Sequence, residues 1–217
     1  MMRYLFLTGI SVSLLFLFPN SESEAHVSFL AERAYLSLGF GEFQCEGFKD
    51  TEGGYVKKNL KAAHVFYVGA GYRFSDHIRS DINFQYSKLN YKVSRGRVHL
   101  EQRIRILSGM LNAYYDLYLD DFTCPYVTIG IGVSNNNPGK LRFTTIKEEF
   151  KGKRRTNLAW NVGGGILLNT ISKDYSIDIG YRYVDFGKIQ TAIQPGANYA
   201  TQKIRGHKGI ISVVFKL

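Results

Sequence analysis

Long hydrophobic runs are missing from most of this chain: beyond residue 25, no stretch of 18 consecutive residues is apolar. A transmembrane helix needs about 20 such residues, so the sequence excludes a helical protein of the inner membrane. Proline is also scarce, with 4 residues, whereas glycine (22), tyrosine (15) and phenylalanine (15) are abundant. Because aromatic residues favour strands and glycine favours tight turns, this balance predicts an all-β fold.

Cysteine is nearly absent, since only Cys45 and Cys124 occur. An oxidising compartment would permit a disulfide. The strand order predicted below puts the two thiols at opposite ends of a barrel, roughly 25 Å apart by the height of its apolar band, so we do not expect them to pair. No cysteine directly follows the N-terminal apolar run, which argues against a lipid anchor.

The N-terminus has the features of a secretory signal. Arg3 precedes an apolar run from Tyr4 to Phe18, and a short polar stretch with Ser23 and Ala25 follows. We predict that residues 1–25 are a signal peptide and that residues 26–217 form one domain. A retained transmembrane helix is the less favoured alternative, because the uncharged run is about 15 residues long and about 20 are needed.

Apolar side chains recur at every second position in eight later segments. In the last one, Leu217, Phe215, Val213 and Ile211 are all apolar. The eight segments are about 35–43, 64–74, 78–86, 104–117, 127–134, 158–168, 175–183 and 207–217. The 40 outward positions in the apolar parts of these segments include no Lys, Arg, Asp or Glu, as expected for a lipid-facing surface, where a charge costs about 2–4 kcal/mol near the midplane.

This pattern predicts an eight-stranded antiparallel up-and-down transmembrane β-barrel. Aromatic residues at the two ends of the strands fit two interfacial girdles: Tyr72, Phe74, Tyr115, Tyr175 and Phe215 at one end, and Phe40, Phe66, Tyr86, Trp160 and Tyr183 at the other. A soluble barrel of the lipocalin type is the alternative, but its outward face would be polar.

Connections between the segments alternate in length. Those after the second, fourth and sixth segments are short, whereas four long ones cover about 44–62, 88–103, 135–155 and 187–205. Short turns belong on the periplasmic side and long loops on the extracellular side. The long loops also carry all of the formal net charge of +10.

A basic surface of this kind attracts polyanions: lipopolysaccharide phosphates of the protein's own membrane, sulfated glycans or acidic patches on a host surface protein. The candidate ligand-binding residues are Arg95, Arg97, Lys140, Arg142, Lys151, Lys153, Arg154 and Arg155. The densest cluster, 151–155, fits either a host-ligand site or a solvated rim that holds lipopolysaccharide. We do not expect a nucleic-acid partner in a secreted barrel.

Charges also occur on the inward face of the predicted strands: Arg73, Arg79, Asp81, Asp116, Asp178 and Arg182. An eight-stranded barrel is only wide enough to be filled by side chains, so we expect these charges to pair as a structural plug. A narrow ion path is the competing interpretation.

Signals of catalysis are weak. None of the five histidines lies in a His-x-Ser arrangement on one strand face, and the two isolated cysteines have no metal-ligand spacing. We therefore predict a protein that is not an enzyme and has no metal or cofactor.

Several motifs carry a resemblance to a known family. They are Gly69-Ala-Gly-Tyr-Arg-Phe74, the stretch Ser108 to Asp116 with Pro125 to Gly132, and Gly180 to Gly187. Here the chain resembles the opacity-type outer-membrane surface antigens. The stretches Thr156 to Trp160 and Gly206 to Lys208, with the ending Phe215 to Leu217, look most like the rickettsial surface adhesins within that family.

The resemblance implies an eight-stranded barrel in the outer membrane of a Gram-negative bacterium, with loops that contact host proteins. Many barrels of this kind end in Phe, so we expect Phe215 to be recognised by the outer-membrane assembly machinery. The predicted function is an adhesin that binds through its basic loops. The alternative is a structural barrel or a small porin without a dedicated ligand.

Overall fold

The computed structural model describes residues 33–46, 62–95, 98–143, 148–150, 152–171, 174–192 and 199–217. The predicted signal peptide (1–25) and most of the first predicted long loop lie outside the described residues. The barrel occupies the compact unit Ala34–Leu217. In the part of the chain that the structure describes, no helix is long and apolar enough to cross a membrane.

Eight long strands build the wall: β1 (Ala34–Cys45), β2 (Ala63–Arg73), β3 (Ile78–Arg95), β4 (Val98–Asp116), β5 (Thr123–Pro138), β9 (Arg155–Asn169), β10 (Tyr175–Ala192) and β11 (Tyr199–Lys216). Three short strands lie between β5 and β9 in the sequence: β6 (Leu141–Phe143), β7 (Glu148–Phe150) and β8 (Gly152–Lys153). Each long strand coincides with one of the eight alternating segments, so this part of the prediction is confirmed.

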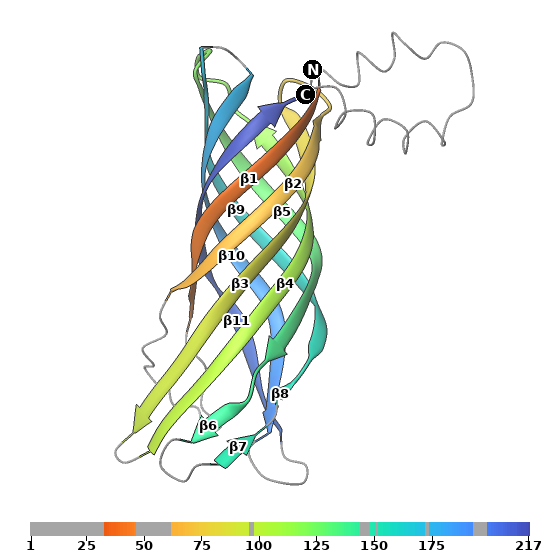
Figure 1. Ribbon diagram of the computed structural model, residues 1–217. Coiled ribbons are helices and arrows are strands. Elements are labelled where there is room, and N and C mark those ends of the chain that lie inside the picture. Colours follow the sequence, from red (N-terminus) through yellow and green to blue (C-terminus); the bar gives the residue numbers. More distant parts are fainter. Residues whose placement is uncertain are drawn as a thin grey trace, which may run out of the picture. The chain divides into compact units, whose positions relative to one another are not determined.

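The wall is closed (Figure 1). Successive long strands pair antiparallel, and β1 pairs with β11 from Tyr35 opposite Lys216 to Cys45 opposite Gly206. Closure leaves none of the eight long strands at a sheet edge, which satisfies the backbone N–H and C=O groups that hydrocarbon could not. The predicted fold, an eight-stranded antiparallel barrel, is confirmed.

Apolar side chains cover the outside of the wall. Large residues such as Phe84, Ile129 and Leu158 are 60%, 65% and 67% exposed, respectively. On the same strands, Asn83, Thr128 and Ala159, at the alternate positions, are buried in the lumen. An exposed apolar surface of this extent is stable only when lipid covers it. The charge-free face predicted from the sequence is therefore the outer face of the barrel.

Short turns close one end of the barrel, as predicted. After β2, the Ser75 hydroxyl accepts a hydrogen bond from the Ile78 N–H at 3.1 Å. After β4, the Asp120 carboxylate accepts hydrogen bonds from the Phe122 N–H at 2.8 Å and the Thr123 N–H. These two backbone donors hold the pKa of Asp120 below its ordinary value. Side-chain hydrogen bonds to the backbone thus stabilise these short turns.

The opposite end differs from the prediction, because strands continue into ranges that we expected to be loops. Strands β3 and β4 pair as far as Arg95 opposite Val98, and β10 and β11 pair as far as Ala192 opposite Tyr199. The reason is that inward positions in these ranges stay apolar: Leu89, Ile189 and Ile204 are at most 1% exposed. Several charges that suggested loops occupy exposed positions of the long strands: Lys88, Arg103, Lys188 and Lys203.

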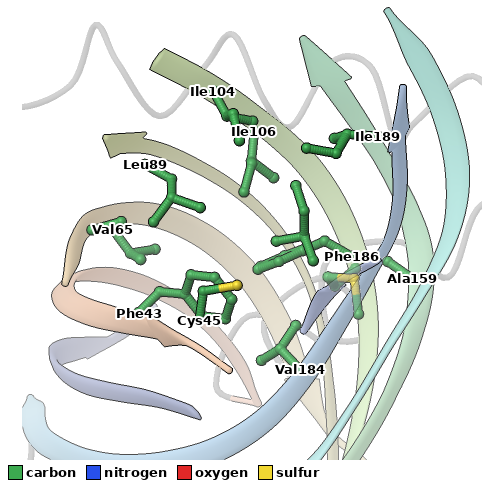
Figure 2. Packing of buried hydrophobic residues seen from close by; sticks show 13 residues of the cluster. Phe43, Cys45, Val65, Leu89, Ile104, Ile106, Ala159, Val184, Phe186 and Ile189 are labelled. Atoms are coloured by element: carbon green, nitrogen blue, oxygen red, sulfur yellow. The ribbon is translucent and has the colours of Figure 1, made fainter. Parts of the chain in front are cut away.

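An apolar cluster fills the lumen toward these extended strands (Figure 2). Phe43 and Phe186 meet edge to face, with ring centroids 5.2 Å apart. Around them lie Val65, Leu89, Ile104, Ile106, Met110, Val184, Ile189, Ile204 and Cys45. Cys124 belongs to a separate buried cluster with Tyr35, Leu167 and Val214, so the two cysteines lie in different parts of the lumen, and both are free.

A bulge in β10 positions Phe186. The register between β10 and β11 shifts between Asp185 and Lys188, and Gly187 between them has a φ of 77°. This left-handed conformation favours glycine. The Gly187 N–H donates to the Asp185 carboxylate at 2.7 Å, and the Phe186 carbonyl accepts from Asn136 Nδ2 at 2.7 Å. The bulge thereby fixes the aromatic ring inside the lumen.

Candidate functional site

Asp116 is the centre of one group of lumen charges. Its carboxylate is fully buried and accepts hydrogen bonds from Arg79 Nε at 3.0 Å to each oxygen, and from Arg73 Nη1 at 3.1 Å. The Arg79 guanidinium also lies over the Tyr114 ring, 4.0 Å from its centroid. Removing one partner from a buried ion pair of this kind costs about 3–5 kcal/mol.

Asp81 is the centre of a neighbouring group. Its carboxylate accepts from Asn112 Nδ2 at 2.6 Å, the Tyr114 hydroxyl at 2.6 Å and Asn83 Nδ2 at 3.2 Å. Arg182 Nη2 in turn donates to the Tyr114 hydroxyl at 3.0 Å. Tyr114 therefore links the two groups, since its ring contacts Arg79 and its hydroxyl joins Arg182 to Asp81.

Asp178, on β10, is the centre of a third group, with partners on β5 and β11. It accepts hydrogen bonds from the Tyr126 hydroxyl at 2.7 Å and the Ser212 hydroxyl at 3.5 Å. The six charges that the sequence assigns to the lumen thus lie on the inward face of the wall, where the three carboxylates are the centres of three hydrogen-bonded groups. Arg73 is at the mouth, where its side chain remains 22% exposed.

Lys208 also lies in the lumen, although it was not among the predicted lumen charges. This side chain is 3% exposed, and its Nζ donates to Gln85 Oε1 at 2.8 Å. Strand parity would have revealed it, because His207 and Gly209 on either side face outward. With Lys208, four basic side chains and three carboxylates are known on the inward face of the wall.

The lumen is therefore filled at two levels. Ion pairs, tyrosines and amides occupy it toward the short turns, and the apolar cluster occupies it toward the extended strands. Both levels suit the narrow interior of an eight-stranded barrel, which side chains alone can fill.

Six of the eight predicted ligand-binding residues are among the described residues, and these six lie at the end of the barrel where the strands are extended. Arg95 ends β3, Arg142 lies on β6, and Lys140 is exposed after β5. Arg97 and Lys151 lie outside the described residues. Two short strands attach this region to two different long strands, because β6 pairs with β4 and β8 pairs with β10.

Three consecutive cations mark the path from β8 into β9. Lys153 and Arg154 are exposed, and Arg155 is half-buried at the start of β9. Arg154 Nε donates to Asn135 Oδ1 at 2.6 Å, which fixes its guanidinium against the outer side of β5. We call these three residues the rim cluster.

The outer wall also carries an ion-paired group that was not predicted. Glu46 lies 3.0 Å from Arg205 Nε and 3.6 Å from His207 Nε2, while the other ring nitrogen of His207 is 2.7 Å from the Tyr181 hydroxyl. On the next pair of strands, His64 Nδ1 lies 3.7 Å from Glu42. These histidines therefore belong to polar contacts at the border of the apolar band.

Comparisons with known proteins agree with this architecture. A model of the family described as "Outer membrane protein beta-barrel domain" matches residues 11–213. Outer membrane protein PagN of Salmonella typhimurium is 26% identical over 96 residues, which are 42% of this chain and 39% of PagN. The match thus spans well under two thirds of that relative.

Among solved structures, neisserial surface protein A (NspA) is similar with a TM-score of 0.56 at 15% identity, over 85% of this chain and 97% of NspA. At that identity the likeness concerns the fold alone. The family match, the closed wall and its apolar outer face agree with one another. The chain therefore belongs to the family of outer membrane protein β-barrel domains, and it resides in the outer membrane of a Gram-negative bacterium.

Proposed function

We propose that this barrel is a surface adhesin whose basic rim binds an acidic partner on a host surface, either a host protein or a sulfated glycan. The resemblance to rickettsial surface adhesins is part of this proposal. The observation that carries it is the rim cluster, in which Lys153 and Arg154 are exposed beyond the apolar band. Guanidinium and ammonium groups bind sulfate and carboxylate through charge-assisted hydrogen bonds.

The filled lumen supports display of a surface rather than transport through it. Phe43, Leu89, Ile104 and Phe186 are at most 1% exposed and occupy the interior below the rim. A small porin would need a continuous polar path at this level. The structural barrel without a ligand remains the alternative that a binding measurement distinguishes.

The test is binding of the refolded full chain to immobilised heparin and to host-cell surface extract across a salt series. The variant K153Q/R154Q/R155Q removes the rim cluster. The matched control K88Q/R103Q/R105Q removes three exposed cations from the outer face of β3 and β4. Glutamine keeps hydrogen-bonding capacity at each position, so the two variants differ in where charge is lost.

We expect saturable binding that weakens with salt, because screening shortens the range of exposed charges to about 8 Å at 0.15 M. Binding should fall strongly in the rim variant and little in the control. Equal losses in both variants would indicate non-specific charge attraction. Absence of saturable binding by the unaltered chain would leave the structural barrel as the function.

A further inference from the structure

The outer face of the β3–β4 hairpin changes from apolar to cationic between one outward-facing position and the next on each strand. On β3, Tyr86 is followed at the next outward position by Lys88. On β4, Leu107 is followed by Arg105 and then by Arg103. All three cations are exposed, and Tyr86 and Leu107 are 37% and 53% exposed on the lipid side.

We propose that Lys88, Arg103 and Arg105 form a binding site for the phosphate groups of a membrane lipid in the surrounding leaflet. We call these three residues the wall site. This inference goes beyond adhesion and does not rest on it, because the wall site lies on the side of the barrel and the rim cluster on β8 and β9.

Strand register brings the three cations together. Tyr86 is opposite Leu107, Lys88 is opposite Arg105, and Asn90 is opposite Arg103. Directly opposed residues on an antiparallel pair have Cβ atoms about 4.5–5.5 Å apart, where like charges repel. An anion between Lys88 and Arg105 converts this repulsion into attraction.

The strands of the wall site carry one outward carboxylate nearby, Glu101, which is one outward position beyond Arg103 and opposite Lys92 and Arg142. Within the described ranges, none of the ion pairs involves Lys88, Arg103 or Arg105. Lys88 Nζ contacts only the Tyr86 ring, 5.6 Å from its centroid, among the side-chain contacts of the described residues. The adjoining outward residue of β5, opposite Arg105, is the neutral Asn137.

The level of the site matches that of lipid headgroups. Aromatic girdles of a transmembrane barrel mark the border between hydrocarbon and headgroups. The three cations are one to two outward positions beyond Tyr86 and Leu107, and long Lys and Arg side chains extend toward the polar side of such a border. Phosphates of the lipid therefore lie within their reach.

Other parts of the wall differ at the same border. On β1 and β2 the first polar outward residues are Glu42 and His64, which face each other. On β11, Arg205 is already paired with Glu46 at 3.0 Å. The opposed cations Lys188 and Lys203 of β10 and β11 lie farther out, beyond Asp185 and Arg205. The cations of β3 and β4 therefore follow the apolar band directly, with no carboxylate at that border, and guanidinium pairs suit the oxygens of a phosphate monoester.

The test measures retention of diphosphoryl lipid A on the refolded full chain by native mass spectrometry. Dephosphorylated lipid A is the matched ligand. The matched protein control is a shorter rim variant, K153Q/R155Q, which keeps Arg154 because this residue lies against Asn135 of β5, opposite Leu107. We expect K88Q/R103Q/R105Q to bind diphosphoryl lipid A at least about tenfold more weakly than the unaltered chain, given three lost attractions to an anionic surface. The shorter rim variant should bind it normally, and all chains should bind the dephosphorylated lipid weakly and alike.

Heat-dependent electrophoretic mobility establishes that each variant is folded, and K88R/R103K/R105K, which keeps every charge, should retain binding. If the triple glutamine variant does not fold, R105Q alone serves and should weaken binding measurably. The proposal is overturned by equal retention in the wall variant and the shorter rim variant, or by equal retention of the dephosphorylated lipid. Displacement of the lipid by inorganic phosphate would also overturn it, because the site would then take free phosphate. Heparin binding is scored separately, so failure of adhesion leaves this result readable.

Discussion

Toward the short turns, hydrogen-bonded charges around Asp116 and Asp81 fill the lumen, whereas toward the extended strands the apolar cluster around Phe186 and Leu89 fills it. The polar level depends on the identity of each partner, because a buried charge without its counterpart is costly. The apolar level depends on volume, because methyl groups have no preferred partner. The same barrel thus combines a level that tolerates few substitutions with one that tolerates many of similar size.

Asp116→Asn should have the largest effect, because it keeps the shape of the side chain and removes its charge. Arg79 and Arg73 would both lose their carboxylate partner, so we expect the free energy of unfolding to fall by about 3–5 kcal/mol. Urea unfolding of the barrel in lipid vesicles measures it. Asp121→Asn in the exposed turn is the control and should change stability by less than about 0.5 kcal/mol. Similar losses in the two variants would remove the distinction between the levels.

Leu89→Met tests the apolar level with a change of nearly equal volume. Leu89 is fully buried among apolar side chains, so we expect a loss below about 1.5 kcal/mol in the same unfolding measurement. Leu89→Gln, of similar length, should cost more, by about 1–3 kcal/mol, because it buries an unpaired amide. If Met and Gln are equally disruptive, polarity is not what separates the two levels.

Asp120 provides a smaller effect outside both levels. Hydrogen bonds from the Phe122 and Thr123 N–H groups hold its pKa below the ordinary value. A depressed carboxyl pKa stabilises the folded state above the unfolded-state pKa, about 3.9, and this contribution is lost as the pH falls through the folded value. The stability difference between the unaltered chain and Asp120→Ala should therefore shrink between pH 7 and pH 3. A constant difference across that range would contradict this account.

We expect the barrel to conduct no ions. Since the apolar level interrupts any polar path, planar bilayers containing the barrel should show no stepwise current above background. Stepwise currents that change in Arg182→Gln would instead favour the porin alternative. The rim variant, with its lumen intact, is the control for currents that arise at the surface.

Much of the fold could be predicted because a strand in a barrel has a two-residue period. Parity alone separated Phe84 and Ile129 on the outside from Asn83 and Thr128 inside. The strand ends were not predicted, because Lys88 and Arg103 are charged like loop residues although they occupy outward strand positions. Inward apolar residues such as Leu89 and Ile204 carried the missing signal.

The lumen contacts were harder to predict. Parity places Arg79 and Asp116 in the interior, but their pairing depends on the register between β3 and β4, in which Arg79 is opposite Tyr114. The role of Tyr114 as a link had no sequence signal, since its hydroxyl contacts Arg182 on a strand 68 residues away. The bulge at Gly187 was also unforeseen, although it places Phe186 in the interior.

The pairing of β3 with β4 beyond Lys88 has a mechanical consequence. A strand rises by about 3.4 Å per residue, so the seven steps from Lys88 to Arg95 carry the tip about 24 Å along the strand past the apolar band. Near the tip, β4 also pairs with β6 at Leu100 and Glu101, which adds a third strand to part of the projection. A macromolecule that approaches the cell would meet this projection well before it reached the lipid.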